Sequence, residues 1–257
     1  AQNRVCYDLM VIYRELPREG FDTLQMLDLL GISRTKLERA LRNARMSPRI
    51  PYMVTNFISS EVKLRFDEND FPGFYTVYRT IRSYPRKIGG NLLGDVGEIN
   101  ERQLKMKRYA DYRSGDYVGQ SGVEKAYEEE LRGKKGVKIM EKDTHGVVKG
   151  SYMDGMFDSL PEPGNYIVTT IDARLQAFTE ELMRGKVGAA VAIEPSTGEI
   201  LMMVSSPTFD PDEMVGRHRG NNYMKMLYNK RQPMFNRAVK AKYPPGSTFK
   251  LVQGLIG

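Results

Sequence analysis

The sequence predicts an α+β fold organised in two successive parts, with a boundary near residue 165. At 257 residues, with 40% apolar and 10% aromatic side chains, the chain is long enough to bury the cores of two ordinary domains. Strand-like and helical patterns are mixed along both parts, and the Pro- and Gly-rich stretch LPEPGN at 160–165 is typical of a linker. We therefore expect one domain over residues 1–165 and a second over residues 166–257.

The first part opens with one strand and two short helices. Residues 5–13 (VCYDLMVIY) are apolar enough for a buried strand. Asp22 can cap the helix TLQMLDLL and Gly31 can end it, while Ser33 can cap a second helix, RTKLERALRNAR. The predicted buried face of this second helix consists of Leu37, Leu41 and Ala44.

Two further strands and one longer helix are expected before the linker. Toward the end of residues 53–66, apolar residues alternate with polar ones, and this pattern favours a strand. Residues 74–84 are rich in β-branched and aromatic side chains, which also favours a strand. The Gly-punctuated stretch 92–100 (LLGDVGEIN) predicts a loop. A helix is expected over 121–132, begun by a capping box and ended at a glycine. The capping box would consist of Ser121 and Glu124. The buried face would consist of Val123, Tyr127 and Leu131, and Gly133 would end the helix.

The elements around and after the linker are shorter. Residues 135–143 and 145–153 are expected to be short strands, and ARLQAFTEELMRG a helix ended by Gly185. The stretches KVGAAVAIEP and GEILMMVSSP predict a hairpin, in which Gly198 suits a left-handed bulge position.

Composition limits the function only broadly. The net charge of +7 suits an anionic partner such as nucleic acid, a lipid surface or an acidic polymer, without choosing among them. A single cysteine, Cys6, excludes an intrachain disulfide, and the two histidines, His145 and His218, are not spaced as zinc ligands. No run of 18 apolar residues occurs that would span a membrane.

The pattern Ser-x-x-Lys offers the clearest chemistry, because two residues three apart on a helix share a face, about 5–6 Å apart. A neutral lysine there can take the serine proton, and a helix N-terminus favours the developing alkoxide. The chain holds three copies, at Ser33, Ser60 and Ser247. We expect Ser33 to be a helix cap with Lys36 solvated. We also expect Ser60 to lead into a strand, where Lys63 points to the opposite face.

Only the third copy, Ser247 with Lys250, has a supporting context. Pro244 and Pro245 stiffen the approach, and Gly246 allows a sharp turn into the helix that Ser247 begins. The lysine stem is expected to be buried by Phe249, Leu251 and Val252. Burial would lower the pKa of the lysine and so favour its neutral form.

The segment YPPGSTFK (243–250) resembles the first active-site motif of the penicillin-binding proteins, serine D,D-transpeptidases that β-lactams acylate. The hairpin at 189–211, the approach NRAVKAKYPPGSTFK at 236–250 and the helix start TTIDARLQ at 169–176 resemble parts of their transpeptidase domain. Upstream, LLGDVGEIN and DYVGQSGVEKAYEEELRGKKG resemble the non-catalytic pedestal of the class B enzymes, most closely the elongation-specific penicillin-binding protein 2 subfamily.

The resemblance implies a pedestal over residues 1–165, then the first part of a serine transpeptidase, β-lactamase-like domain over 166–257. Ser247 would be the acyl-ester nucleophile and Lys250 the general base, without a metal or organic cofactor. Implied partners are peptidoglycan stem peptides, β-lactams, proteins of the cell-elongation complex and a glycosyltransferase, but no nucleic acid. The implied location is the periplasmic face of the cytoplasmic (inner) membrane, to which a segment absent here would anchor the protein.

The sequence departs from this family at both ends. The family's later motifs, Ser-x-Asn and Lys-Ser/Thr-Gly, do not follow Ser247. The family's membrane anchor and first pedestal strand are also missing. We therefore expect the chain to be a fragment cut inside the catalytic domain, and to be inactive alone.

Two alternatives of other classes stay open. Residues 27–45 can form a helix-turn-helix, whose phosphate contacts would be Arg34, Lys36, Arg39 and Arg42. The strand patterns on both sides of this run, and the scattering of the other basic residues, argue against DNA binding. The second alternative is a non-catalytic interaction or scaffold module of the cell-elongation complex, with the Ser247 segment as a remnant.

Overall fold

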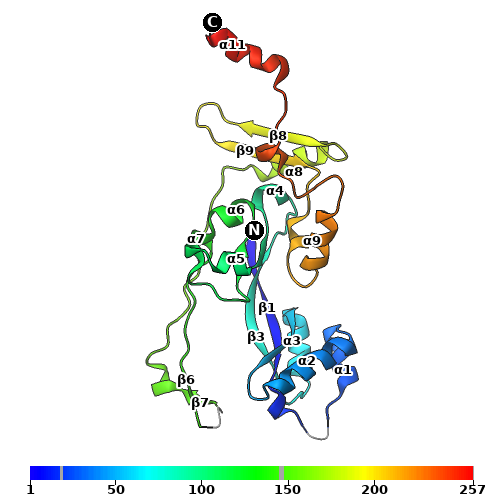
Figure 1. The fold of residues 1–257 in the computed structure, drawn as a ribbon, viewed down its shortest axis with the longest axis vertical. Coiled ribbons are helices and arrows are strands. Elements are labelled where there is room, and N and C mark those ends of the chain that lie inside the picture. The colour runs from blue at the N-terminus through cyan, green and yellow to red at the C-terminus, as the bar shows by residue number, and fades with distance from the viewer. Residues whose placement is uncertain (18–19, 145–147, 257) are drawn as a thin grey trace.

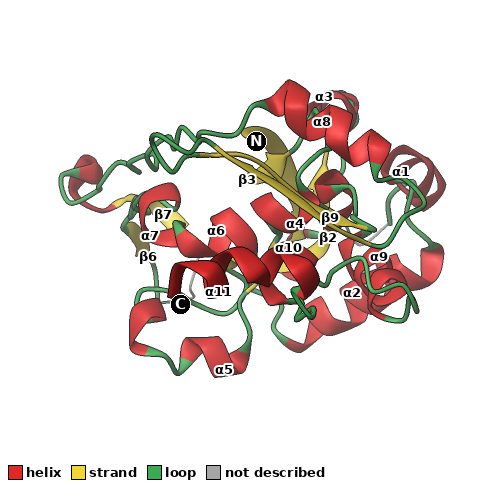
Figure 2. Cartoon of the chain, turned by 90° about the horizontal axis from the view of Figure 1, so that it is seen from above, coloured by secondary structure: helices red, strands yellow, loops and turns green. Residues whose placement is uncertain are grey.

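The computed structural model describes residues 1–17, 20–144 and 148–256. The molecule is elongated, with a sheet and its covering helices at one end, a group of short elements in the middle, and a hairpin with its helices at the other (Figure 1). A two-stranded arm leaves the middle group. Viewed along the long axis, α1 (Thr23–Leu30), α2 (Arg34–Met46) and α9 (Arg219–Leu227) lie on one side and the arm lies on the other (Figure 2).

The sheet at the first end is three-stranded and antiparallel, in the order β2-β1-β3. Its strands are β1 (Gln2–Val11), β2 (Tyr52–Ile58) and β3 (Phe74–Ser83), and β1 pairs with β3 over its whole length. The strands expected at 5–13 and 74–84 are therefore present with shifted ends. A 3-10 turn, η1 (Tyr13–Glu15), follows β1.

Both expected helices of this end are confirmed with their caps. Asp22 caps α1 (Thr23–Leu30), and Gly31 ends it in the left-handed conformation, with φ 57°. Ser33 caps α2 (Arg34–Met46), in which Leu37 and Ala44 are buried and Leu41 is partly buried.

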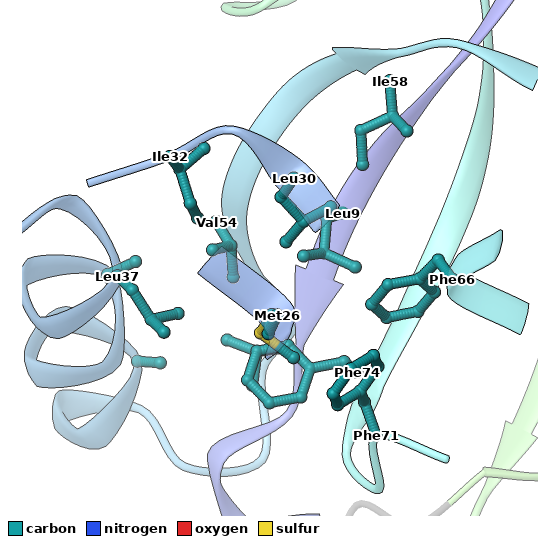
Figure 3. Close-up of a cluster of buried hydrophobic side chains, with 13 residues drawn as sticks. Leu9, Met26, Leu30, Ile32, Leu37, Val54, Ile58, Phe66, Phe71 and Phe74 are labelled. Carbon is teal, nitrogen blue, oxygen red and sulfur yellow. The ribbon is translucent and has the colours of Figure 1, made fainter. Parts of the chain in front are cut away.

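These helices cover one face of the sheet and close the main hydrophobic core (Figure 3). Leu9, Val11 and Met26 have no exposed surface, and Leu30 and Phe74 are also buried. Phe66 stacks on Phe71, with ring centroids 5.1 Å apart. This contact attaches the helix after β2 to the same core.

The strand expected over 53–66 is only half right. It ends at Ile58, and α3 (Ser60–Asp67) follows, with the side chain of Ser59 accepting a hydrogen bond from the Val62 N–H. The apparent alternation did not indicate a strand, because Leu64 is 64% exposed and only Phe66 in this helix is buried. A serine cap decided the conformation instead.

The middle group contains structure where a loop was expected. Residues 92–100 lie in α4 (Gly90–Leu93), β4 (Val96–Glu98) and the turn that follows, and β4 pairs with β5 (Tyr117–Gly119). Asn100 and Gln103 form a capping box at α5 (Glu101–Leu104), and the 3-10 turn η2 (Lys107–Tyr109) comes next.

The helix expected over 121–132 is broken in two, α6 (Gly122–Ala126) and α7 (Glu128–Leu131). The expected capping box is wrong, because the Ser121 hydroxyl bonds Asp95 instead of the helix backbone. The expected stripe is wrong as well, since Tyr127 is 46% exposed while Glu124 and Glu128 are buried.

The arm consists of β6 (Met140–Lys142) and β7 (Val148–Ser151), followed by the 3-10 turn η3 (Tyr152–Gly155). Both short strands are confirmed within narrower limits, and residues 145–147 of the second lie outside the described residues. Isolated bridges join Lys134 to Glu162 and Val137 to Ser159, so the stretch expected to be a linker begins as the returning side of the arm.

The other end of the molecule carries the second set of elements. Asp172 caps α8 (Ala173–Leu182), and β8 (Gly188–Ile193) and β9 (Ile200–Ser206) form the expected hairpin. Gly198 has φ 77°, as its place in the turn predicts. The remaining elements are η4 (Pro211–Met214), α9 (Arg219–Leu227), α10 (Arg237–Lys240), η5 (Gly246–Phe249) and α11 (Lys250–Ile256).

Candidate functional site

The Ser247 segment turns into a helix as predicted. Gly246 takes the left-handed conformation, with φ 59°, which only glycine adopts readily. Ser247 then lies on the 3-10 turn η5, and the Lys250 N–H donates to the Ser247 carbonyl at the start of α11. The Thr248 hydroxyl donates back to the Pro245 carbonyl and fixes the turn from inside. Serine and lysine therefore lie three apart on one continuous helical segment.

The expected burial of the lysine stem is wrong in this structure. Ser247 and Lys250 are exposed, and Phe249, Leu251 and Val252 are 47%, 78% and 44% exposed. The reason is the placement of α11, which projects beyond the β8–β9 hairpin (Figure 1). The roles of Ser247 and Lys250 stay predictions.

The start of the chain leading to this segment is held far more firmly, at Arg237. The Arg237 side chain, 8% exposed, donates to the carbonyls of Arg231, Gln232 and Phe235. The Arg237 N–H donates to the Ser205 hydroxyl at 2.9 Å, and that hydroxyl donates to the Phe235 carbonyl. The start of α10 is thus attached to β9.

Residues 84–97, which we call the docking segment, join the middle group to the hairpin end. The Tyr84 N–H donates to Asp212 Oδ1 and the Gly89 N–H to Glu180 Oε1, at 2.9 and 2.8 Å. Gly90 packs so closely that an added Cβ would lie 2.2 Å from the Phe209 carbonyl oxygen. The first part of the docking segment, residues 84–90, therefore forms an internal interface with the hairpin end.

A buried ion pair completes this interface. Arg219 Nη2 lies 2.6 Å from Asp95 Oδ2, and Arg219 Nε donates to the Val96 carbonyl at 3.0 Å. Asp95 is 2% exposed. Sequence reasoning missed this pair, because its partners are 124 positions apart. The segment LLGDVGEIN, which contains Asp95, gave no indication of a partner.

A cavity of about 580 Å³ lies between the docking segment and the chain that leads to Ser247. Its lining includes Asn91, Asp95, Arg219, Asn236 and Lys240. Asn91 and Asn236 each direct their side-chain NH₂ to a carbonyl across the interface, those of Pro233 and Asn91 respectively. This cavity therefore brings Asn91 and Asp95 of the docking segment next to the chain that leads to Ser247.

The other two Ser-x-x-Lys copies differ from expectation. Lys36 is only partly exposed, and its Nζ donates to Thr55 Oγ1 at 3.1 Å. Burial, with Arg217 and Arg39 nearby, lowers the pKa of Lys36 below its usual value. Ser33 is the helix cap, as expected. The Lys36 side chain contacts Thr55 of the same chain, in place of the phosphate contact that DNA binding would require.

Ser60 and Lys63 were expected to point to opposite faces of a strand. This prediction is wrong, because both residues lie on α3. Lys63 forms an ion pair with Asp67 one turn later, and its Nζ lies 5.3 Å from the Tyr7 ring centroid. The ion pair raises the pKa of Lys63, which opposes a role as a neutral base. Among the residues that the structure describes, no three His, Cys, Asp or Glu side chains are grouped as a metal site would require.

Comparison with known proteins finds family matches for both parts of the chain. Residues 1–169 match the penicillin-binding protein dimerisation domain, and residues 188–257 match the penicillin-binding protein transpeptidase domain. The chain therefore belongs to the penicillin-binding protein family, with a dimerisation domain followed by part of a transpeptidase domain. The predicted α+β fold and the resemblance to class B enzymes are confirmed.

Individual relatives agree with this assignment. The chain is 34% identical over 226 residues to the peptidoglycan D,D-transpeptidase MrdA of Acinetobacter baumannii, covering 87% of this chain and 32% of that protein. It is 30% identical over 266 residues to MrdA of Escherichia coli K12, covering 97% and 40%. The penicillin-binding protein PBP2 of Helicobacter pylori, solved in complex with MreC, superimposes with a TM-score of 0.71 at 25% identity, covering 99% and 48%.

The chain thus spans less than half the length of these relatives. No helix in the described ranges is long and apolar enough to cross a membrane.

Proposed function

We propose that this chain is part of a peptidoglycan D,D-transpeptidase that cross-links stem peptides during cell-wall elongation and that β-lactams acylate. The observation that carries the proposal is the match of residues 188–257 to the transpeptidase domain, because this range contains Ser247 and Lys250 in the segment YPPGSTFK. Relatives along most of the chain carry the name peptidoglycan D,D-transpeptidase.

In the proposed mechanism, Lys250 Nζ is neutral and takes the proton of the Ser247 hydroxyl. Ser247 Oγ attacks the carbonyl between the two terminal D-alanines of a stem peptide. The bond to the last D-alanine breaks, that residue leaves with a proton on its nitrogen, and an acyl-enzyme ester remains. An amine from a neighbouring strand then attacks the ester and forms the cross-link, which restores the serine hydroxyl. The Ser247 N–H is a candidate oxyanion donor, a contribution typically worth about 3 kcal/mol.

The pedestal is proposed to connect the enzyme with other cell-wall proteins. One solved relative is a complex of PBP2 with MreC, and another, with a TM-score of 0.62, belongs to a peptidoglycan synthase complex described as coordinating polymerization and crosslinking. We therefore propose partners in the cell-elongation complex, including a glycosyltransferase, and a location at the periplasmic face of the inner membrane.

The proposal is tested by labelling a complete protein that contains this chain with a fluorescent penicillin, followed by a denaturing gel. One covalent label per molecule is expected in the wild type and none in Ser247→Ala. Lys250→Met should slow labelling at least a hundredfold, because the serine then lacks its base. Lys242→Met, an exposed lysine on the same approach, is the matched control and should label normally.

Absence of labelling in the wild type, or a label that survives in Ser247→Ala, would refute the proposal. The scaffold alternative would then be the better description of the chain.

A further inference from the structure

We propose that Asp95 and Arg219 are positioning residues, through which the pedestal sets the placement of the chain leading to Ser247 and thereby the rate of acylation. This inference rests on the transpeptidase function proposed above. It concerns a different part of the molecule, the internal interface between the docking segment and residues 219–236.

The ion pair fixes the beginning of that stretch. Arg219 is the first residue of α9, and its guanidinium binds both the Asp95 carboxylate and the Val96 carbonyl. The Ser121 hydroxyl donates to the other carboxylate oxygen, Asp95 Oδ1, at 2.6 Å. A Cβ added at Gly97 would lie 2.5 Å from Arg219 Nη2, so the backbone of β4 leaves no room for the guanidinium to shift toward it.

The same docking segment fixes the end of the stretch. Asn91 Nδ2 donates to the Pro233 carbonyl at 2.9 Å, and Asn236 Nδ2 donates to the Asn91 carbonyl at 3.2 Å. Residues 219–236 are therefore held at both ends by pedestal residues that are only four positions apart, Asn91 and Asp95. Any rotation of the pedestal against the hairpin end must move both attachments together.

The attachment reaches the beginning of the approach to the nucleophile, at Asn236 and Arg237. Asn236 is the N-cap residue of α10. The next residue, Arg237, is buried and donates to three carbonyls. Ser247 follows eleven positions after Asn236. Catalytic groups are sensitive to placement, and a displacement of about 1 Å can reduce a rate a hundredfold. A pair that decides where this approach begins is therefore expected to influence the reaction without contacting substrate.

The burial of the pair makes it a strong constraint. The Asp95 side chain is 3% exposed and that of Arg219 is 22% exposed, so removal of one partner leaves the other charge without compensation away from water. Lys87 and Asp210 form a second ion pair across the same interface, at 3.4 Å, but the Lys87 side chain is 66% exposed. An exposed pair of this kind contributes little. It supplies the matched control.

The experiment measures fluorescent-penicillin acylation of a complete protein containing this chain, as an observed rate and as a final labelled fraction. Asp95→Asn and Arg219→Gln should each lower the rate constant at saturating penicillin about tenfold, and the double variant should be no slower than the slower single variant. The penicillin concentration for half-maximal rate should change less than twofold. Arg219→Lys, which keeps the charge, should recover part of the rate, and Lys87→Gln should match the wild type.

The observed rate and the final labelled fraction together distinguish a displaced nucleophile from a loss of folded protein. A variant that merely folds poorly lowers the labelled fraction, whereas a displaced nucleophile lowers the rate of the molecules that do react. Should Asp95→Asn fail to fold, Ser121→Ala removes only one hydrogen bond to Asp95 and is expected to slow acylation two- to threefold. If the wild type labels and all these variants react at its rate, the inference is wrong. If the wild type does not label, the proposed function itself fails.

Discussion

Arg82 and Glu124 form an ion pair between β3, an edge strand of the sheet, and α6 of the middle group. Arg82 Nη2 lies 3.0 Å from Glu124 Oε2, and the Tyr84 hydroxyl donates to Glu124 Oε1 at 3.0 Å. Burial and the Glu124 carboxylate raise the pKa of Tyr84 above its ordinary value, so this hydroxyl stays a donor throughout the physiological range. One buried carboxylate therefore joins the two halves of the pedestal.

The first prediction concerns this carboxylate. Glu124→Gln leaves the Arg82 guanidinium without its counter-charge in a site that is 18% exposed, and we expect the free energy of unfolding to fall by about 2 kcal/mol. Urea unfolding followed by circular dichroism measures the change. Glu129→Gln, which removes an exposed carboxylate from the following helix, is the control and should have little effect. Equal midpoints for both variants would contradict the assigned role of Glu124.

The second prediction concerns the close approach at Gly90. Gly90→Ala places a Cβ 2.2 Å from the Phe209 carbonyl oxygen, so the docking segment must move away from the hairpin end. We expect a loss of about 2 kcal/mol or more, and faster proteolysis between the two ends. Gly220→Ala in α9 has open space around its Cβ and should be neutral or stabilising by up to about 1 kcal/mol. Wild-type stability in Gly90→Ala would show that the two ends are not in contact here.

The third prediction is a pH dependence that originates at Cys6. Burial, followed by the nearby Asp8 carboxylate, raises the pKa of the Cys6 thiol from 9.0 to about 11. Between these pH values the thiol ionises in the unfolded chain but stays protonated in the folded one, so rising pH favours unfolding. Relative to Cys6→Ala, the wild type should lose on the order of 2 kcal/mol between pH 8.5 and 11.

Urea midpoints of the wild type and of Cys6→Ala, measured at half-unit pH steps, test this dependence. The comparison cancels the titration of other groups, because both proteins share them. Parallel stability curves across this range would show that the thiol has the same pKa in the folded and unfolded chains.

The fourth prediction is that the 257-residue chain alone does not label with fluorescent penicillin. Ser247 and Lys250 are exposed, so water solvates the lysine and the nucleophile lacks the surroundings that would stabilise a transition state. The complete protein labelled in parallel provides the positive control. Stoichiometric labelling of the short chain at Ser247 would overturn this expectation.

Local signals in the sequence were sufficient for elements that depend on their own neighbours. The caps at Asp22 and Ser33 and the glycine turns at Gly31 and Gly198 follow from hydrogen bonds and backbone preferences within a few residues. The Ser-x-x-Lys segment at Ser247 was likewise readable, because its turn requires Gly246 in the left-handed conformation.

Predictions failed where distant partners competed for the same groups. Ser121 and Glu124 have the spacing of a capping box, but Asp95 takes the serine hydroxyl, while Arg82 and Tyr84 take the carboxylate. In α3, apolar side chains that alternate in the sequence belong to a helix, because Ser59 caps it and only Phe66 of this helix is fully buried.

By itself, then, the sequence determined the α+β class, several local turns and the Ser247 motif, because each depends on residues close together in the chain. The tertiary structure alone decided that the docking segment is an interface, that Arg219 meets Asp95, and that Lys36 Nζ contacts Thr55 while Lys250 is exposed. These outcomes depend on which surfaces meet after folding, and a spacing along the chain carries no information about a partner more than a hundred residues away.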